Sequence, residues 1–132
     1  MEDKELIKNY FKNDRFVELA GIEIEEICEE FVTVSAEIDQ RHLNANGFVQ
    51  GGMLYTLADF AFAVLGNYLH PVTVTQGGQI QYVRAVKAKK IKATATEKIR
   101  SGHNTVCDVT IENDGGEIVC LCRFNGFVKE KI

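Results

Sequence analysis

A long, strongly apolar segment constrains the fold of this chain more than any other feature of its sequence. Residues 50–69 follow a Gly-rich turn and predict one helix, which ends just before Pro71. Nearly every position from Met53 to Leu65 is apolar, as expected for a helix that other elements cover on most sides. Such a helix needs a large apolar surface elsewhere in the chain to pack against.

This segment carries a single acid, Asp59, in its interior. Asp is a poor residue inside a helix, and it is costly to bury without a partner. The positions three and four residues away hold no basic side chain: Tyr55, Thr56, Phe62 and Ala63. An unpaired carboxylate on an apolar helix indicates a working group. The alternative is an Asp on the one solvated edge of the helix.

The flanking segments predict a short amphipathic helix over residues 2–13 and a series of strands. Six strands are predicted: 16–29, 30–39, 72–83, 88–99, 104–112 and 117–128. Because no crossover helices separate them, the fold class is α+β, with a curved antiparallel sheet wrapped around the long helix. Residues 1–132 are expected to form a single domain.

Composition excludes several classes of protein. No apolar run approaches the roughly 18–20 residues of a membrane span. The N-terminal residues lack signal-peptide character, so we expect a cytoplasmic protein that does not associate with membranes. The cysteines have no metal-ligand spacing with the histidines, and they read as reduced core residues: Cys28, Cys107, Cys120 and Cys122. We assign no chemistry to the histidines, which lie on predicted loops or turns: His42, His70 and His103.

The charges are distributed unevenly in a chain of formal net charge −4. Residues 23–30 are acidic, whereas residues 84–100 hold seven Lys or Arg and a single acid, Glu97. A basic stretch of this kind indicates an anionic partner or a charged, protected edge strand. Nucleic acid is disfavoured as the partner because no aromatic residues interleave with the basic ones.

The run from Asn44 to Ala61 resembles the signature of the PaaI-like (phenylacetate-pathway) hotdog-fold acyl-CoA thioesterases. That family usually reads Asn-x-x-Gly-x-x-His-Gly-Gly, with an Asp eight residues after the first Gly of the pair. Here the pair is Gly51-Gly52 and the acid is Asp59, but Gln50 replaces the His. The match is good over residues 44–62 and extends more weakly over most of the chain. It implies a hotdog fold.

The resemblance implies hydrolysis of an acyl-CoA to a free acid and CoA, without a metal or a redox cofactor. Asp59 would activate water as a general base or attack the thioester directly. The helix start at Gly51 would polarise the thioester carbonyl and stabilise the oxyanion, because its N–H groups lack intrahelical acceptors. Tight helix–sheet packing is the alternative role for this Gly pair.

Three further residues match or approach the family's site. Asn44 would help to position the thioester or the water, or it stabilises its own loop as an Asx turn. Gln50 cannot titrate as His can, so only a positioning hydrogen bond is left to it. The resemblance places the hydroxyl of Thr75 near the acid, where it would help to hold water. Arg84 and Lys87 are the candidates for binding the CoA phosphates.

Geometry predicts that the site is shared between two chains. Gly51 and Asp59 are eight residues apart, which is about 12 Å along a helix, so one chain cannot place both on one carbonyl. Two antiparallel copies of the helix across a two-fold axis can do so. The sequence therefore predicts a homodimer or a dimer of dimers, and the resemblance implies the same.

Two other functions stay open. One is a non-catalytic acyl-CoA-binding hotdog module, which the replacement by Gln50 favours. The other is a hotdog dehydratase, which is disfavoured because its catalytic His has no counterpart in or beside the helix. The pair Gly77-Gly78 predicts a bulge or extra room for an acyl group, and Tyr82 is interpreted as a packing residue.

Overall fold

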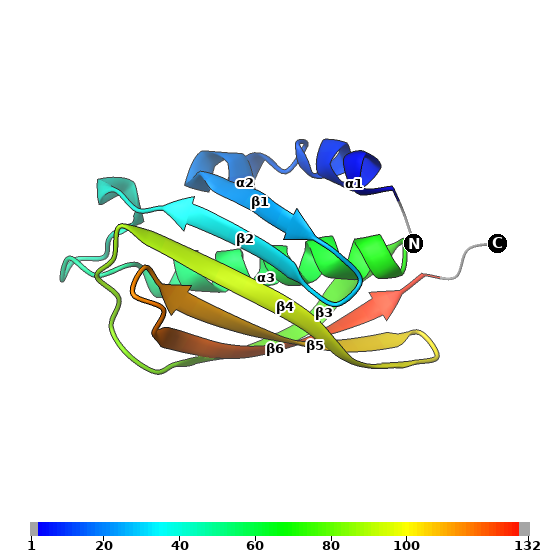
Figure 1. Cartoon of the computed structure of the whole chain (residues 1–132). Coiled ribbons are helices and arrows are strands. Elements are labelled where there is room, and N and C mark those ends of the chain that lie inside the picture. Colours follow the sequence, from blue (N-terminus) through cyan, green and yellow to red (C-terminus); the bar gives the residue numbers. More distant parts are fainter. Residues whose placement is uncertain (1–2, 130–132) are drawn as a thin grey trace.

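The computed structural model describes residues 3–129 and confirms the α+β prediction (Figure 1). The helices are α1 (Lys4–Phe11), α2 (Arg15–Ala20), the 3-10 turn η1 (Gln40–His42) and α3 (Gly51–Leu69). The strands are β1 (Ile22–Ile27), β2 (Val32–Glu37), β3 (Thr73–Tyr82), β4 (Lys90–Ser101), β5 (Asn104–Asn113) and β6 (Ile118–Val128). They form one antiparallel sheet in the order β1-β2-β4-β5-β6-β3, which curves around α3 in the hotdog arrangement.

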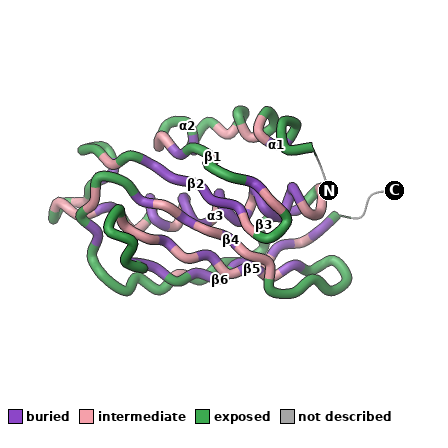
Figure 2. The backbone as a smooth tube through the Cα atoms, in the orientation of Figure 1, coloured by how far each residue is buried: buried purple, intermediate pink, exposed green. Residues whose placement is uncertain are grey.

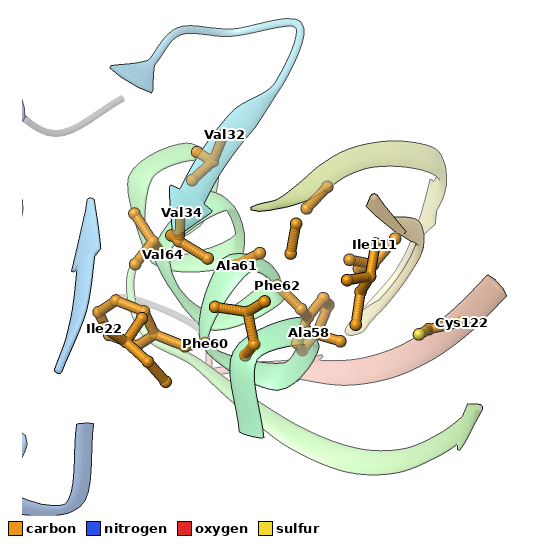
Figure 3. Packing of buried hydrophobic residues seen from close by; sticks show 14 of the residues in the cluster. Ile22, Val32, Val34, Ala58, Phe60, Ala61, Phe62, Val64, Ile111 and Cys122 are labelled. Carbon is orange, nitrogen blue, oxygen red and sulfur yellow. The ribbon is translucent and has the colours of Figure 1, made fainter. Parts of the chain in front are cut away.

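Burial of α3 against the concave face of the sheet forms the core. Figure 2 shows buried positions along much of α3 and at intervals along the strands. The ring of Phe62 is fully buried and stacks on Phe124 of β6, with 5.5 Å between the ring centroids. Val34 of β2 and Ile111 of β5 are also fully buried, and Figure 3 shows them at different places around the helix. Removal of this apolar surface from water is the main term that holds the helix in the sheet.

The predicted strand from residue 16 is wrong at its start, because residues 15–20 form α2. The carboxylate of Asp14 caps this helix by accepting a hydrogen bond from the Val17 N–H at 3.1 Å. Gly21 ends it in the left-handed conformation, with a φ of 73°, and β1 begins at Ile22. Six residues are too few to show the period of a helix. Only the capping residues, Asp14 and Gly21, indicated this helix in the sequence.

Within residues 3–129, strand β3 forms one edge of the sheet and pairs only with β6. The register shifts between Thr75 and Gly77, which confirms a bulge at this point. A Cβ at Gly78 would overlap the Tyr55 hydroxyl and the Phe124 ring. Gly78 therefore makes room for these two aromatic side chains. The alternative of extra room for an acyl group at the glycine pair stays a prediction, because a Cβ at Gly77 would meet nothing within 4 Å.

The cysteines are reduced, and most of them lie in the core, as predicted. Within residues 3–129 all four are free thiols, and three of them are buried: Cys107, Cys120 and Cys122. Burial raises the pKa of Cys107 and Cys122 to about 12, so both stay protonated near neutral pH. No helix in this part of the chain is long and apolar enough to cross a membrane. The same residues contain no cluster of three or more His, Cys, Asp or Glu suited to a metal ion.

Candidate active site

The start of α3 presents two backbone N–H groups without acceptors. The carbonyl of Gln50, the N-cap residue, accepts from the N–H groups of Met53 and Leu54 at 2.9 and 3.2 Å. The N–H groups of Gly51 and Gly52 have no acceptor within residues 3–129, and the Gln50 side chain does not cap the helix. The positive end of the helix dipole therefore offers two donors to an incoming oxygen atom.

The side chain of Tyr82, at the end of β3, reaches this helix start. Its hydroxyl donates a hydrogen bond to the Gly51 carbonyl at 3.0 Å. The side chain is 52% exposed, so Tyr82 packs against the helix start and does not belong to the core. Sequence spacing could not reveal this contact, because the two residues lie 31 positions apart.

Asp59 lies two turns further along α3, where Thr75 of β3 faces it. The Thr75 hydroxyl donates to Asp59 Oδ1 at 2.9 Å. Desolvation raises the pKa of Asp59 above its ordinary value, the Thr75 hydrogen bond opposes this, and the nearby carboxylate of Asp14 adds to the rise. No Lys, Arg or His forms an ion pair with Asp59 in the described part of the chain. A half-buried acid with a raised pKa is the kind of group that can accept a proton.

One protomer does not bring Asp59 to the free N–H groups. Gly51 and Asp59 both belong to α3, so about 12 Å separates them along the helix axis. One chain therefore cannot place both groups on one carbonyl, as the sequence predicted. That a second chain completes the site stays a prediction.

Asn44 lies in the loop before α3, and its side-chain carbonyl is already occupied. That oxygen accepts from the N–H groups of Asn46 at 2.9 Å and Phe48 at 3.1 Å, as in an Asx turn. Only the Nδ2 amide of Asn44 is then left to donate to a substrate or a water molecule. These hydrogen bonds confirm that Asn44 stabilises its own loop as an Asx turn. Its role in positioning the thioester or the water stays a prediction.

Arg84 and Lys87, the candidates for CoA phosphates, follow β3 on the surface. Arg84 Nε donates to the Ile118 carbonyl at 3.0 Å, and its Nη1 lies 3.4 Å from a Glu117 oxygen. The Lys87 ammonium lies over the Phe48 ring, 5.1 Å from its centroid. Their role in CoA binding stays a prediction.

His70 has an acidic partner on β4. Its Nε2 lies 2.7 Å from Glu97 Oε2, and Arg100 Nη1 lies 2.9 Å from its Nδ1. The sequence could not show this pair because Glu97 is 27 residues away, on β4. His70 follows the last residue of α3, about 27 Å from Gly51. It is therefore too far from the start of α3 in its own chain to act there.

An apolar recess, whose lining includes Gly52, lies between α2 and the first turns of α3. Its volume is about 580 Å³, and its lining comes from both helices and η1: Phe16, Leu19, Ala20, Arg41, His42, Gln50, Gly52, Met53 and Thr56. A hollow of about 640 Å³ between α1, α2 and β1 is larger, but charged residues such as Lys8, Arg15 and Glu18 line it. The recess is thus the cavity that adjoins the free donors.

Known proteins of similar sequence and structure agree with this architecture. No protein-family model matches the chain. The acyl-coenzyme A thioesterase PaaI of Escherichia coli is 29% identical over 114 residues, which cover 86% of this chain and 81% of that protein. The solved structure of E. coli PaaI, from the phenylacetic acid degradation operon, superposes with a TM-score of 0.88 at 27% identity, over 96% and 94% of the two chains.

Two further solved structures are similar over most of their length. The phenylacetic acid degradation protein PaaI of Thermus thermophilus, solved as a mutant, is 29% identical, with a TM-score of 0.82 over 88% of this chain and all of that one. A hypothetical thioesterase of Streptococcus pneumoniae, solved with coenzyme A, is 27% identical, with a TM-score of 0.82 over 92% and 98% of the two chains.

Proposed function

We propose that this chain, which belongs to the PaaI-like family of hotdog-fold acyl-CoA thioesterases, hydrolyses an acyl-CoA to a free acid and CoA. One observation carries the assignment of the site. The half-buried carboxylate of Asp59, without a cationic partner and held by Thr75, lies on the helix whose start exposes two free N–H groups. These are the base and the oxyanion donors that thioester hydrolysis needs.

The proposed reaction uses these groups in sequence. A water molecule that is hydrogen-bonded to Asp59, beside its contact with Thr75, loses a proton to the Asp59 carboxylate as the water oxygen attacks the thioester carbon. The carbonyl oxygen becomes negative and accepts hydrogen bonds from the Gly51 and Gly52 N–H groups of a second chain. The C–S bond then breaks, and the proton passes to the departing CoA sulfur. In a covalent variant, the Asp59 carboxylate itself attacks the carbon, and the C–S bond breaks so that CoA leaves as a thiolate, which takes a proton from solvent. Water then hydrolyses the resulting anhydride to the free acid and restores the Asp59 carboxylate.

A symmetric dimer supplies the second chain in this proposal. The outer edge of β3 has no strand beside it, and most of its side chains are exposed. Part of α3 beside it is also accessible, including Thr56, Asp59 and Ala63. Pairing of two such edges brings two α3 helices together in antiparallel orientation, with Gly51 of one facing Asp59 of the other.

We further propose that the apolar recess receives the acyl group. It opens beside Gly52, where the thioester carbonyl would lie, and its walls carry the exposed apolar side chains of Phe16 and Leu19. The one cation on its rim, Arg41, already donates to the Leu19 carbonyl at 2.8 Å. An apolar acyl chain fits this lining better than a charged one.

Replacing Leu19 by Asp should therefore weaken turnover of long acyl chains more than short ones. Leu19 is 69% exposed, so the change should leave the fold intact. We expect kcat/KM to fall about tenfold for a six- to eight-carbon acyl-CoA and little for acetyl-CoA. Leu6→Asp on α1, where Leu6 is 61% exposed, is the matched control. An equal loss for both chain lengths, or a loss caused by the control, would contradict this placement and would point to a partner chain in the recess.

Replacing Gln50 by His, the residue usual in the family, should leave the fold intact and should not lower turnover. The imidazole has a reach similar to that of the amide and can also donate a hydrogen bond. Release of CoA thiol, followed with Ellman's reagent over a panel of acyl-CoA substrates, measures the effect. A large gain would identify the parental protein as an attenuated enzyme, or as a binding module if it is inactive. Loss of activity in a folded protein would show that the site is built around Gln50.

A further inference from the structure

The Gly51 carbonyl and the Gly52 N–H belong to the same peptide group, which is planar and rigid. Whatever holds the carbonyl therefore also sets the direction of the N–H. The carbonyl accepts from the Tyr82 hydroxyl at 3.0 Å. The Gly52 N–H, at the other end of this peptide, has no acceptor in residues 3–129 and lies beside the apolar recess.

Tyr82 is itself held by the sheet and not by a mobile loop. It is the last residue of β3 and lies opposite Cys120 of β6. Partial desolvation raises the pKa of Tyr82 above its ordinary value, and the nearby thiols and the Tyr55 phenol add to the rise. The hydroxyl is therefore protonated near neutral pH and can donate. A donor on a rigid strand is well suited to fix a reacting group.

The first glycine of the pair fits this contact. A Cβ at Gly51 would lie 3.2 Å from the Tyr82 hydroxyl oxygen and 3.3 Å from Cζ, which is tighter than ordinary van der Waals contact. A Cβ at Gly52 would meet nothing closer than the Gln50 Cγ at 4.0 Å. Gly51 thus lets the phenol approach the backbone, while Gly52 supplies the exposed donor.

We propose that Tyr82 is a positioning residue for the oxyanion donors: its hydroxyl fixes the Gly51–Gly52 peptide so that the Gly52 N–H points to the thioester oxygen. A hydrogen bond to the carbonyl also polarises the peptide and makes its N–H a stronger donor. Preorganised donors act mainly on the transition state, so the effect should fall on kcat and not on KM. The inference rests on the proposed function.

The test is Tyr82→Phe, which removes the hydroxyl and keeps the ring. We expect kcat to fall about 3- to 10-fold, as for the loss of one neutral hydrogen bond, with KM and Tm close to the parental values. Tyr10→Phe, at a tyrosine that is 60% exposed on α1, is the matched control and should leave kcat unchanged. The Gly52 amide signal in an NMR spectrum should shift upfield in Tyr82→Phe and stay in place in Tyr10→Phe.

These measurements test thioester hydrolysis and the positioning role of Tyr82 separately. A parental protein without activity on any acyl-CoA would refute the proposed function, and the Gly52 amide signal would then decide the role of Tyr82 alone. In an active protein, an unchanged kcat in Tyr82→Phe would overturn the inference. A loss in which KM rises or Tm falls together with kcat would also overturn it, because Tyr82 would then have only a structural role.

Discussion

The Asp59→Asn variant is expected to fold normally and to lose about 10²–10⁴-fold in kcat, the usual effect of removing a general base. Asn has nearly the same shape, and its Oδ1 can still accept the Thr75 hydrogen bond that Asp59 accepts at 2.9 Å. It cannot take a proton from water or attack a thioester. Release of CoA thiol from a good acyl-CoA substrate measures the loss.

A matched control separates this effect from a general loss of negative charge. Asp108→Asn removes a partly exposed carboxylate on β5 that pairs with Arg123 at 2.6 Å. This variant should keep the parental kcat. An Asp59→Asn protein that hydrolyses acyl-CoA at the parental rate while folded would show that the base lies elsewhere.

The raised pKa of Asp59 has two consequences that can be measured against pH. The base must be ionised, so kcat/KM should decline on the acid side at a pH above the ordinary range of an Asp carboxyl. The raised pKa also makes folding stability fall as pH rises, whereas an acid in an ion pair makes stability rise with pH. The folded state binds the proton more tightly than the unfolded state, so stability is lost as pH rises from the unfolded pKa through the folded one. Asp59→Asn lacks this penalty, so its Tm near neutral pH should equal or exceed the parental Tm.

The sequence predicted the parts of the fold that depend on composition over many residues. The apolar run from Met53 to Leu65 specified a covered helix, and the strand-rich second half of the chain specified the sheet that covers it. The short helix α2 was missed because its six residues give too little periodicity, although its capping residues Asp14 and Gly21 were visible. Capping signals deserve more weight where a segment is short.

The sequence likewise predicted only part of the candidate site. Asp59 and Thr75 were both named from the sequence, and the structure places them in hydrogen-bond contact. The contact from Tyr82 to the helix start was missed, as was the pairing of His70 with Glu97. Both contacts join residues that are 27 or more positions apart, so only the folded sheet brings them together.

Mixing two inactive variants should restore activity if the sites are shared between chains. Asp59→Asn lacks the base, and a bulky residue at Gly51, such as Val, presses on Tyr82 and displaces the oxyanion donors. In a mixed dimer, one site combines the intact Gly51 of one chain with the intact Asp59 of the other. The second site of that dimer carries both defects.

Statistical exchange of subunits sets the size of the recovery. About half of the dimers are then mixed, and each has one intact site of two, so the mixture should regain about one quarter of the parental activity. Differently tagged chains, purified in tandem, verify that mixed dimers have formed, and a mixture of each variant with itself is the control. Verified mixed dimers without activity would rule out sites that join Gly51 and Asp59 of different chains. Because about 12 Å of helix separates these residues within one chain, that result would also require a base other than Asp59 or an oxyanion donor other than the start of α3.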